Sequence, residues 1–259
     1  MKIISFQARN APVIGYLHDD HDRLVAHKTR PALVILAGGG YNHLSPREGE
    51  PVALRFFAEG YQCFLLHYSL NEAAGGLRPL HEAGETLRLL RERAAEFRID
   101  PERVAILGFS AGGHLAASLS ALWDSPEAGL TEASRPDALI LCYPVITMGA
   151  FAHAGSRELV CAGDGELTEL LSIEKQVGKS MPPTFVWHCV GDEAVPVENT
   201  LLLAEALQRA GVDYECHLFA GGAHGISLCN RETESPNPSA AAWVGLCLTW
   251  LNERMNFEP

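Results

Sequence analysis

Residues 104–116 read VAILGFSAGGHLA, and this stretch decides the fold. The apolar run over 104–107 predicts a buried strand, and a helical spacing of apolar residues begins near His114. Between them, residues 108–112 match the pattern Gly-x-Ser-x-Gly. Between a strand and a helix, this pattern forms a tight, strained turn that exposes its serine, and a side chain at either glycine would collide across the turn. We therefore predict that Ser110 is a nucleophile.

A nucleophilic serine requires a histidine as general base and a carboxylate that orients the histidine. With this type of turn, the chain order is serine, acid, histidine. Asp192 comes directly after a late apolar strand, at the carboxyl end where open α/β sheets place their chemistry. His224 comes soon after the last predicted strand, among small residues. We predict that Ser110, Asp192 and His224 form a catalytic triad; Glu193 and Glu198 are the close alternatives for the acid.

A second glycine-rich loop, residues 37–41 (AGGGY), follows an early buried strand. Glycines at this place allow backbone amides to approach a tetrahedral oxyanion without a Cβ in the way. We predict an oxyanion hole made of the amides of Gly39, Gly40 and Ala111. A nucleotide-binding loop is excluded, because His43 stands where the third glycine of that motif would be and no Walker-type sequence occurs.

Several segments together resemble a known family. The chain is similar to the α/β-hydrolases of the acetyl esterase/lipase kind, in particular to a bacterial branch related to acetylxylan and feruloyl esterases and described as sugar-ester hydrolases. The resemblance covers nearly the whole chain and implies the α/β-hydrolase fold and its Ser-His-Asp triad, although Ala37 replaces the histidine usual in the family's glycine loop. The segments that carry it are residues 37–41, 45–48, 100–104, 108–114, 142–145, 187–188, 192–196 and 222–225.

The order of predicted elements indicates an α/β protein. After an expected antiparallel hairpin at the sheet edge, strands and helices alternate, which is typical of a parallel sheet with right-handed crossovers. We therefore expect a single domain over residues 1–259, with a mostly parallel eight-stranded sheet and helices on both faces. Strands are predicted at 2–7, 12–17, 31–36, 61–67, 103–107, 137–142, 184–190 and 213–219, and helices at 49–59, 79–97, 113–123, 197–210 and 238–254.

The connection over residues 145–183 is too long for a simple link between a strand and a helix. We expect it to form a small helical cap over Ser110. The residues expected in this cap include Phe151, His153, Leu159, Leu170 and Leu171.

Composition limits the partners and the compartment. The formal net charge of −12 argues against nucleic acid and anionic membranes as partners. No apolar run reaches transmembrane length, and residues 1–7 are too short and polar for a secretory signal, so a cytoplasmic location is expected. The seven cysteines show no framework spacing and are expected to be mostly reduced core thiols. A homo-oligomer is compatible with the sequence.

Other histidines and carboxylates have simpler interpretations than catalysis. Residues 18–22 (HDDHD) contain metal-ligand types in a row, but a solvated turn between edge strands accounts for them, because metal ligands converge from several elements. His114 and His188 are interpreted as packing residues. Glu85, Glu92 and Glu96, on the helix predicted over 79–97, are interpreted as a solvated face. Triad chemistry requires no metal and no cofactor, so none is expected.

These observations favour a serine carboxylesterase that acts on a small-molecule ester. A shallow pocket for short, acetyl-type acyl groups is expected, with Tyr41, His43 and Tyr143 as candidate lining residues. The resemblance implies acetylated sugars or xylo-oligosaccharides as substrates. Two alternatives stay open. One is an amide hydrolase, a peptidase or an enzyme of the aryl formamidase type, and the other is a ligand-binding protein on a non-catalytic hydrolase scaffold.

Overall fold

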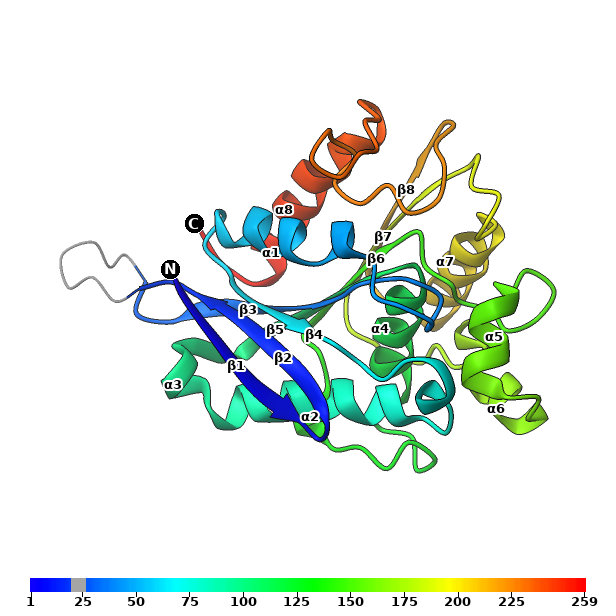
Figure 1. Ribbon diagram of the computed structural model, residues 1–259, viewed down its shortest axis with the longest axis horizontal. Coiled ribbons are helices and arrows are strands. Elements are labelled where there is room, and N and C mark those ends of the chain that lie inside the picture. Colours follow the sequence, from blue (N-terminus) through cyan, green and yellow to red (C-terminus); the bar gives the residue numbers. More distant parts are fainter. Residues whose placement is uncertain (20–26) are drawn as a thin grey trace.

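One eight-stranded sheet organises the part of the chain that the computed structural model describes, residues 1–19 and 27–259 (Figure 1). The order across the sheet is β1-β2-β4-β3-β5-β6-β7-β8. The central position of β5 brings the serine turn to the middle of the sheet edge. The strands are β1 (Lys2–Ala8), β2 (Ala11–Leu17), β3 (Arg30–Leu36), β4 (Gln62–Leu66), β5 (Ile99–Phe109), β6 (Ala138–Cys142), β7 (Thr184–Cys189) and β8 (Tyr214–Phe219).

The strand directions confirm the predicted, mostly parallel sheet. β1 and β2 form the expected antiparallel edge hairpin. β2 also pairs antiparallel with β4, and each following pair from β4 to β8 is parallel. The carboxyl ends of β3, β5, β6, β7 and β8 therefore meet at one edge, which is where parallel sheets gather functional loops.

Helices cover both faces of the sheet, as predicted. Alternation along β3 explains why both faces are apolar: Val34 and Leu36 belong to one core cluster, and Leu33 and Ile35 to the other. The first cluster packs under α2, α4 and α7, and the second under α1 and α8 (Figure 1). The helices are α1 (Glu50–Phe57), α2 (Arg78–Glu92), α3 (Ala94–Phe97), α4 (Ser110–Leu122), α5 (Ala154–Cys161), α6 (Gly165–Leu170), α7 (Glu198–Ala210) and α8 (Trp243–Arg254).

Several element boundaries differ from the prediction. The helix expected over 79–97 is two helices, because the backbone at Arg93 (φ −102°, ψ 23°) leaves the helical region without a glycine or proline to signal it. β5 begins at Ile99, before Pro101, because Ile99 already pairs with Arg30 of β3; the register then shifts, and Ala32 pairs with Val104. The helix expected from 238 begins at Trp243, after a short 3-10 helix at Ala240–Ala242.

The segment between β6 and β7, expected to form the cap, contains α5, α6 and a short 3-10 helix at Ile173–Lys175. In Figure 1, α5 and α6 lie together beyond the edge at which the parallel strands end. Of the metal-type run over residues 18–22, residues 20–22 lie outside the described part of the chain. His18 stacks on the ring of Phe57, at 3.8 Å between ring centroids.

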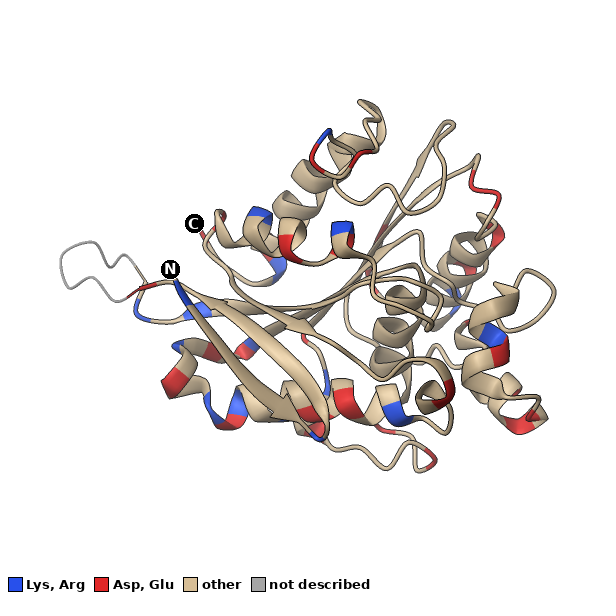
Figure 2. Ribbon diagram, viewed as in Figure 1, with Lys and Arg blue, Asp and Glu red and all other residues tan. Residues whose placement is uncertain are grey.

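Charged residues are distributed along the outer helices (Figure 2). On α2, Arg88 forms ion pairs with Glu85 at 2.8 Å and Glu92 at 2.9 Å, so the predicted solvated face is observed. Among the described residues, no helix is both long enough and apolar enough to cross a membrane.

Candidate active site

The serine turn between β5 and α4 has a strained backbone. Ser110 has a φ of 53°, in the left-handed region that serine rarely adopts. A Cβ on Gly108 would lie 2.2 Å from the carbonyl oxygen of Gly112. A Cβ on Gly112 would lie 2.2 Å from the carbonyl oxygen of Leu36. The two glycines are therefore required by contact with neighbouring backbone, and helix α4 begins directly at Ser110 instead of at the predicted residue 113.

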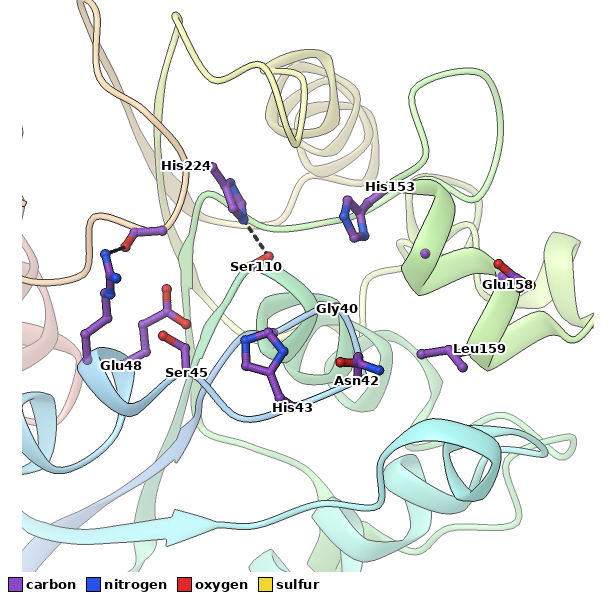
Figure 3. Close-up of a pocket in the computed structure, with 14 residues that line it drawn as sticks. Gly40, Asn42, His43, Ser45, Glu48, Ser110, His153, Glu158, Leu159 and His224 are labelled. Carbon is purple, nitrogen blue, oxygen red and sulfur yellow. Dashed lines mark hydrogen bonds between the residues drawn. The ribbon is translucent and has the colours of Figure 1, made fainter.

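The loops after β7 and β8 bring an acid and a base to this serine. His224 Nε2 lies 2.7 Å from Ser110 Oγ, as the dashed line in Figure 3 shows. His224 Nδ1 lies 2.6 Å from Asp192 Oδ2. With the proton on Nδ1, the ring donates to the carboxylate and offers Nε2 as an acceptor to the serine hydroxyl. The three side chains predicted as a triad thus form one hydrogen-bonded chain.

Asp192 is buried and held in one orientation. Its Oδ1 accepts the backbone N–H groups of Ala194 at 3.0 Å and Val195 at 2.9 Å. Burial raises the pKa of Asp192, but hydrogen bonds from His188 and His224 outweigh it, so the pKa lies well below its usual value. The acid therefore stays ionised at neutral pH. Glu193, a sequence-level alternative, is exposed.

His188 contacts the same carboxylate and was not predicted to do so. It is fully buried, and its Nε2 lies 3.3 Å from Asp192 Oδ2 and 3.0 Å from the carbonyl oxygen of Val195. The carbonyl can only accept, so Nε2 carries the proton. Nδ1 then accepts the hydroxyl hydrogen of Thr200 at 2.8 Å. His188 is a packing residue, as predicted, but it also supports the acid.

The glycine loop after β3 presents two amides to the site. Gly38 N–H donates to Glu48 Oε2 at 2.8 Å and is therefore occupied. Within the described residues, no group accepts from the amides of Gly39 or Gly40. The amide of Ala111 lies in the first turn of α4, where N–H groups have no partner inside the helix. These three amides are the ones proposed from the sequence as the oxyanion hole.

Glu48 is a buried carboxylate at this site to which the sequence analysis assigned no role. Tyr143 donates its hydroxyl hydrogen to Glu48 Oε1 at 2.7 Å and accepts the N–H of Ser227 at 2.8 Å. Burial raises the pKa of Glu48, and the hydrogen bonds from Tyr143 and Gly38 oppose that rise. Tyr143 was expected to line the pocket; instead its ring is buried and its hydroxyl is used to join two loops.

Tyr41 also lies elsewhere than expected. Its hydroxyl lies 2.8 Å from Nδ1 of His114, and Nε2 of His114 donates to the carbonyl oxygen of Leu171 at 2.9 Å. Burial lowers the pKa of His114 to about 4, so its ring is neutral at pH 7. Tyr41 therefore supports the glycine loop from behind instead of facing a substrate, and His114 is a packing residue, as predicted.

A cavity of about 720 Å³ opens over Ser110 (Figure 3). His43 lines it, as predicted, and the segment between β6 and β7 contributes residues to its wall. Among the described residues, no group of three or more histidine, cysteine or acidic side chains could hold a metal ion. The lining residues are Gly39, Gly40, Asn42, His43, Ser45, Arg47, Glu48, Ser110, His153, Gly155, Glu158, Leu159, His224 and Gly225.

Curated relatives of this chain include larger proteins. It is 36% identical over 230 residues to endo-1,4-beta-xylanase B of Butyrivibrio fibrisolvens, which covers 85% of this chain and 35% of the relative. It is 30% identical over 205 residues to an acetylxylan esterase of Xylanibacter ruminicola, covering 76% of this chain and 41% of the relative. The chain thus spans well under half the length of these two relatives.

Solved structures match the fold along almost the entire chain. An acetyl ester-xyloside bifunctional hydrolase from Caldicellulosiruptor lactoaceticus has a TM-score of 0.84 at 35% identity, with 96% of this chain and 89% of that chain covered. The carboxylesterase Cest-2923 from Lactobacillus plantarum has a TM-score of 0.88 at 29% identity, with 98% of each chain covered. The sequence pattern of one family, BD-FAE, matches residues 21–207. The chain therefore belongs to the BD-FAE family and has the α/β-hydrolase fold.

Proposed function

We propose that this chain is a serine carboxylesterase that removes short acyl groups from hydroxyl-rich alcohols. One observation carries the proposal: a serine with a strained backbone lines the cavity and is hydrogen-bonded to a histidine that is itself hydrogen-bonded to a buried carboxylate. This arrangement activates a hydroxyl for attack on a carbonyl carbon. Esterases and carboxylesterases among the similar proteins support the same reaction class.

The reaction proceeds through an acyl-enzyme. Ser110 Oγ attacks the ester carbonyl while His224 Nε2 takes the hydroxyl proton, and the C–O double bond becomes a single bond to an oxyanion. The amides of Gly39, Gly40 and Ala111 stabilise that oxyanion. His224 then gives its proton to the leaving alcohol as the ester bond breaks. Water repeats the sequence on the acyl-enzyme, and the carboxylic acid leaves.

The substrate class follows from the lining of the cavity and from the relatives. Asn42, His43, Ser45 and Glu158 give the cavity a polar wall, which suits an alcohol with several hydroxyl groups better than a long alkyl chain. The names of two similar proteins, an acetylxylan esterase and an acetyl ester-xyloside hydrolase, support acetylated xylose units. The proposed substrate is therefore an acetylated sugar or short xylo-oligosaccharide.

The test is a comparison of kcat/KM on p-nitrophenyl esters from acetate to dodecanoate and on acetylated xylo-oligosaccharides. We expect the shortest acyl chains to be preferred and acetate to be released from the oligosaccharides. Ser110→Ala is expected to lower kcat by about 10⁴- to 10⁶-fold while the melting temperature stays near that of the wild type. Activity that rises steadily with acyl length would contradict the substrate class. A Ser110→Ala protein with more than about a few per cent of wild-type activity would contradict the mechanism.

A further inference from the structure

His153 brings an imidazole from the segment between β6 and β7 to the catalytic cavity. It precedes α5 and lines the cavity near Ser110 and His224 (Figure 3). Its ring rests on the oxyanion loop, since a Cβ on Gly40 would lie only 3.2 Å from His153 Cε1. The ring is half-buried, and the triad chemistry described above does not use it.

The tautomer of His153 is fixed by the helix that it caps. The backbone N–H of Ser156 donates to His153 Nδ1 at 3.2 Å, in the N-cap position of α5. A backbone N–H can only donate, so Nδ1 must be without a proton and the hydrogen of the neutral ring is on Nε2. Burial lowers the pKa of His153, which favours this neutral form.

The Nε2–H group of His153 is left with no acceptor in the protein. Within the described part of the chain, no group accepts a hydrogen bond from it, although the ring lines an open cavity. A polar donor in such a position binds an oxygen of the substrate or a water molecule. In an acetyl ester the carbonyl oxygen is taken by the oxyanion amides, and the methyl group accepts nothing. An acceptor supplied by the substrate therefore belongs to the alcohol part.

We propose that His153 is a specificity residue whose Nε2–H donates a hydrogen bond to a hydroxyl oxygen on the alcohol part of the ester. This inference rests on the proposed function and assigns recognition of the hydroxyl-rich alcohol to one named donor. Glu158, on the next turn of α5, lines the same wall and adds an acceptor for hydroxyl hydrogens.

Two substitutions separate recognition of the alcohol from support of the helix. His153→Asn retains a good N-cap, because the asparagine oxygen can accept the Ser156 N–H, but its side chain is too short to reach the cavity. His153→Gln places an amide N–H near the position of the imidazole Nε2–H, but glutamine is a poor N-cap. A purely structural role predicts that the asparagine variant resembles the wild type. A recognition role predicts that the glutamine variant, and not the asparagine variant, resembles the wild type.

The experiment compares two ring esters: a mono-O-acetylated methyl xyloside, whose alcohol part carries free hydroxyl groups, and cyclohexyl acetate, whose alcohol part carries none. The readout is the ratio of their kcat/KM values, with kcat and KM separated and melting temperatures recorded for each protein. In His153→Asn we expect this ratio to fall by about three- to tenfold, the effect of one neutral hydrogen bond, mainly through KM for the xyloside. In His153→Gln we expect the ratio to stay within about twofold of the wild type.

The outcomes separate this inference from the proposed function. A wild-type enzyme that cleaves cyclohexyl acetate but not the xyloside would contradict the proposed substrate class, and the inference with it. A wild-type enzyme that cleaves the xyloside, together with an unchanged ratio in His153→Asn, would overturn the role of His153 alone. An equal fall of the ratio in both variants would also overturn it, because the donor would then not be what matters.

Discussion

At the scale of single residues, Asp192 is notable for the number of donors around it. Its two oxygens accept from two backbone amides, from His224 and from His188. The carboxylate oxygens therefore face donors alone: two backbone amides, which can only donate, and two imidazole N–H groups. An amide in place of this carboxylate would turn an NH₂ group toward one of those donors, whichever way it is oriented.

Asp192→Asn is accordingly expected to preserve the shape of the loop but to favour the wrong tautomer of His224. The imidazole would then present N–H to Ser110 instead of a lone pair, and kcat is expected to fall by about 10³- to 10⁴-fold, with partial recovery at high pH. The measurement is kcat on one short-chain ester from pH 6 to 9. The control is Glu193→Gln at an exposed position, for which a change under about tenfold is expected. An inactive Glu193→Gln enzyme beside an active Asp192→Asn enzyme would reverse the assignment.

The residues found from the sequence are marked by short local patterns, whereas the residues missed are defined by contacts between distant parts of the chain. Ser110, Asp192 and His224 follow strand ends in a fixed chain order, so a linear pattern was enough to select the three side chains that the structure brings together. Glu48 meets Tyr143 across 95 positions of sequence, and no periodicity reports a contact of that kind. Tyr41 has a φ of 62°, and its side chain lies behind the loop, although the glycines beside it face the site.

At the scale of elements, the turn between β5 and α4 is fixed by backbone contacts. Gly112→Ala would place a methyl group within 2.2 Å of the carbonyl oxygen of Leu36, at the end of β3. Neither atom belongs to a flexible side chain, so a strand or a helix must shift. We expect a loss of more than about 3 kcal/mol in the free energy of unfolding, measured by urea denaturation.

Gly245 provides a matched control in another helix. It is exposed in α8, and a Cβ there would meet nothing within 4 Å. Gly245→Ala is therefore expected to stabilise the protein by about 0.5–1 kcal/mol, because alanine has the higher helix propensity. If both substitutions changed stability in the same direction and by similar amounts, steric contact at Gly112 would not be the cause.

The boundaries of elements were harder to predict than their existence. The glycines at the start of α4 are poor helix formers, so the apolar spacing placed its first turn three residues late. The break between α2 and α3 occurs in a run of good helix formers and is visible only in the dihedral angles of Arg93. The order and direction of the strands were predictable because they follow from the alternation of strand and helix along the chain.

At the scale of the whole molecule, His114 joins three parts: helix α4, the glycine loop after β3 through Tyr41, and the segment between β6 and β7 through Leu171. Burial lowers its pKa to about 4, whereas an unfolded histidine has a pKa of about 6.5. Between these values the unfolded chain binds a proton that the folded chain does not. Its contribution to stability is therefore present above pH 6.5 and is lost as the pH falls toward 4.

We expect the free energy of unfolding of the wild type to fall by up to about 3 kcal/mol more than that of His114→Gln between pH 7 and pH 4. Glutamine can contact both Tyr41 and Leu171 but does not titrate. The measurement is a pair of urea denaturation curves at several pH values for each protein. Parallel loss of stability in the two proteins would mean that His114 is not the group that titrates.

The buried Glu48 has a consequence for how the site withstands heat. Through Gly38 it holds the loop that carries the proposed oxyanion amides, and through Tyr143 it holds Ser227, three residues after His224, the proposed base. Ser227 in turn donates its hydroxyl hydrogen to the carbonyl oxygen of Arg47, the residue before Glu48. Because Glu48 is bound to both loops, neither loop can loosen without breaking contacts of the other. We therefore expect the two loops to lose their structure together on heating. Heating is then expected to displace the amides proposed to stabilise negative charge and the proposed proton acceptor, His224, at the same temperature.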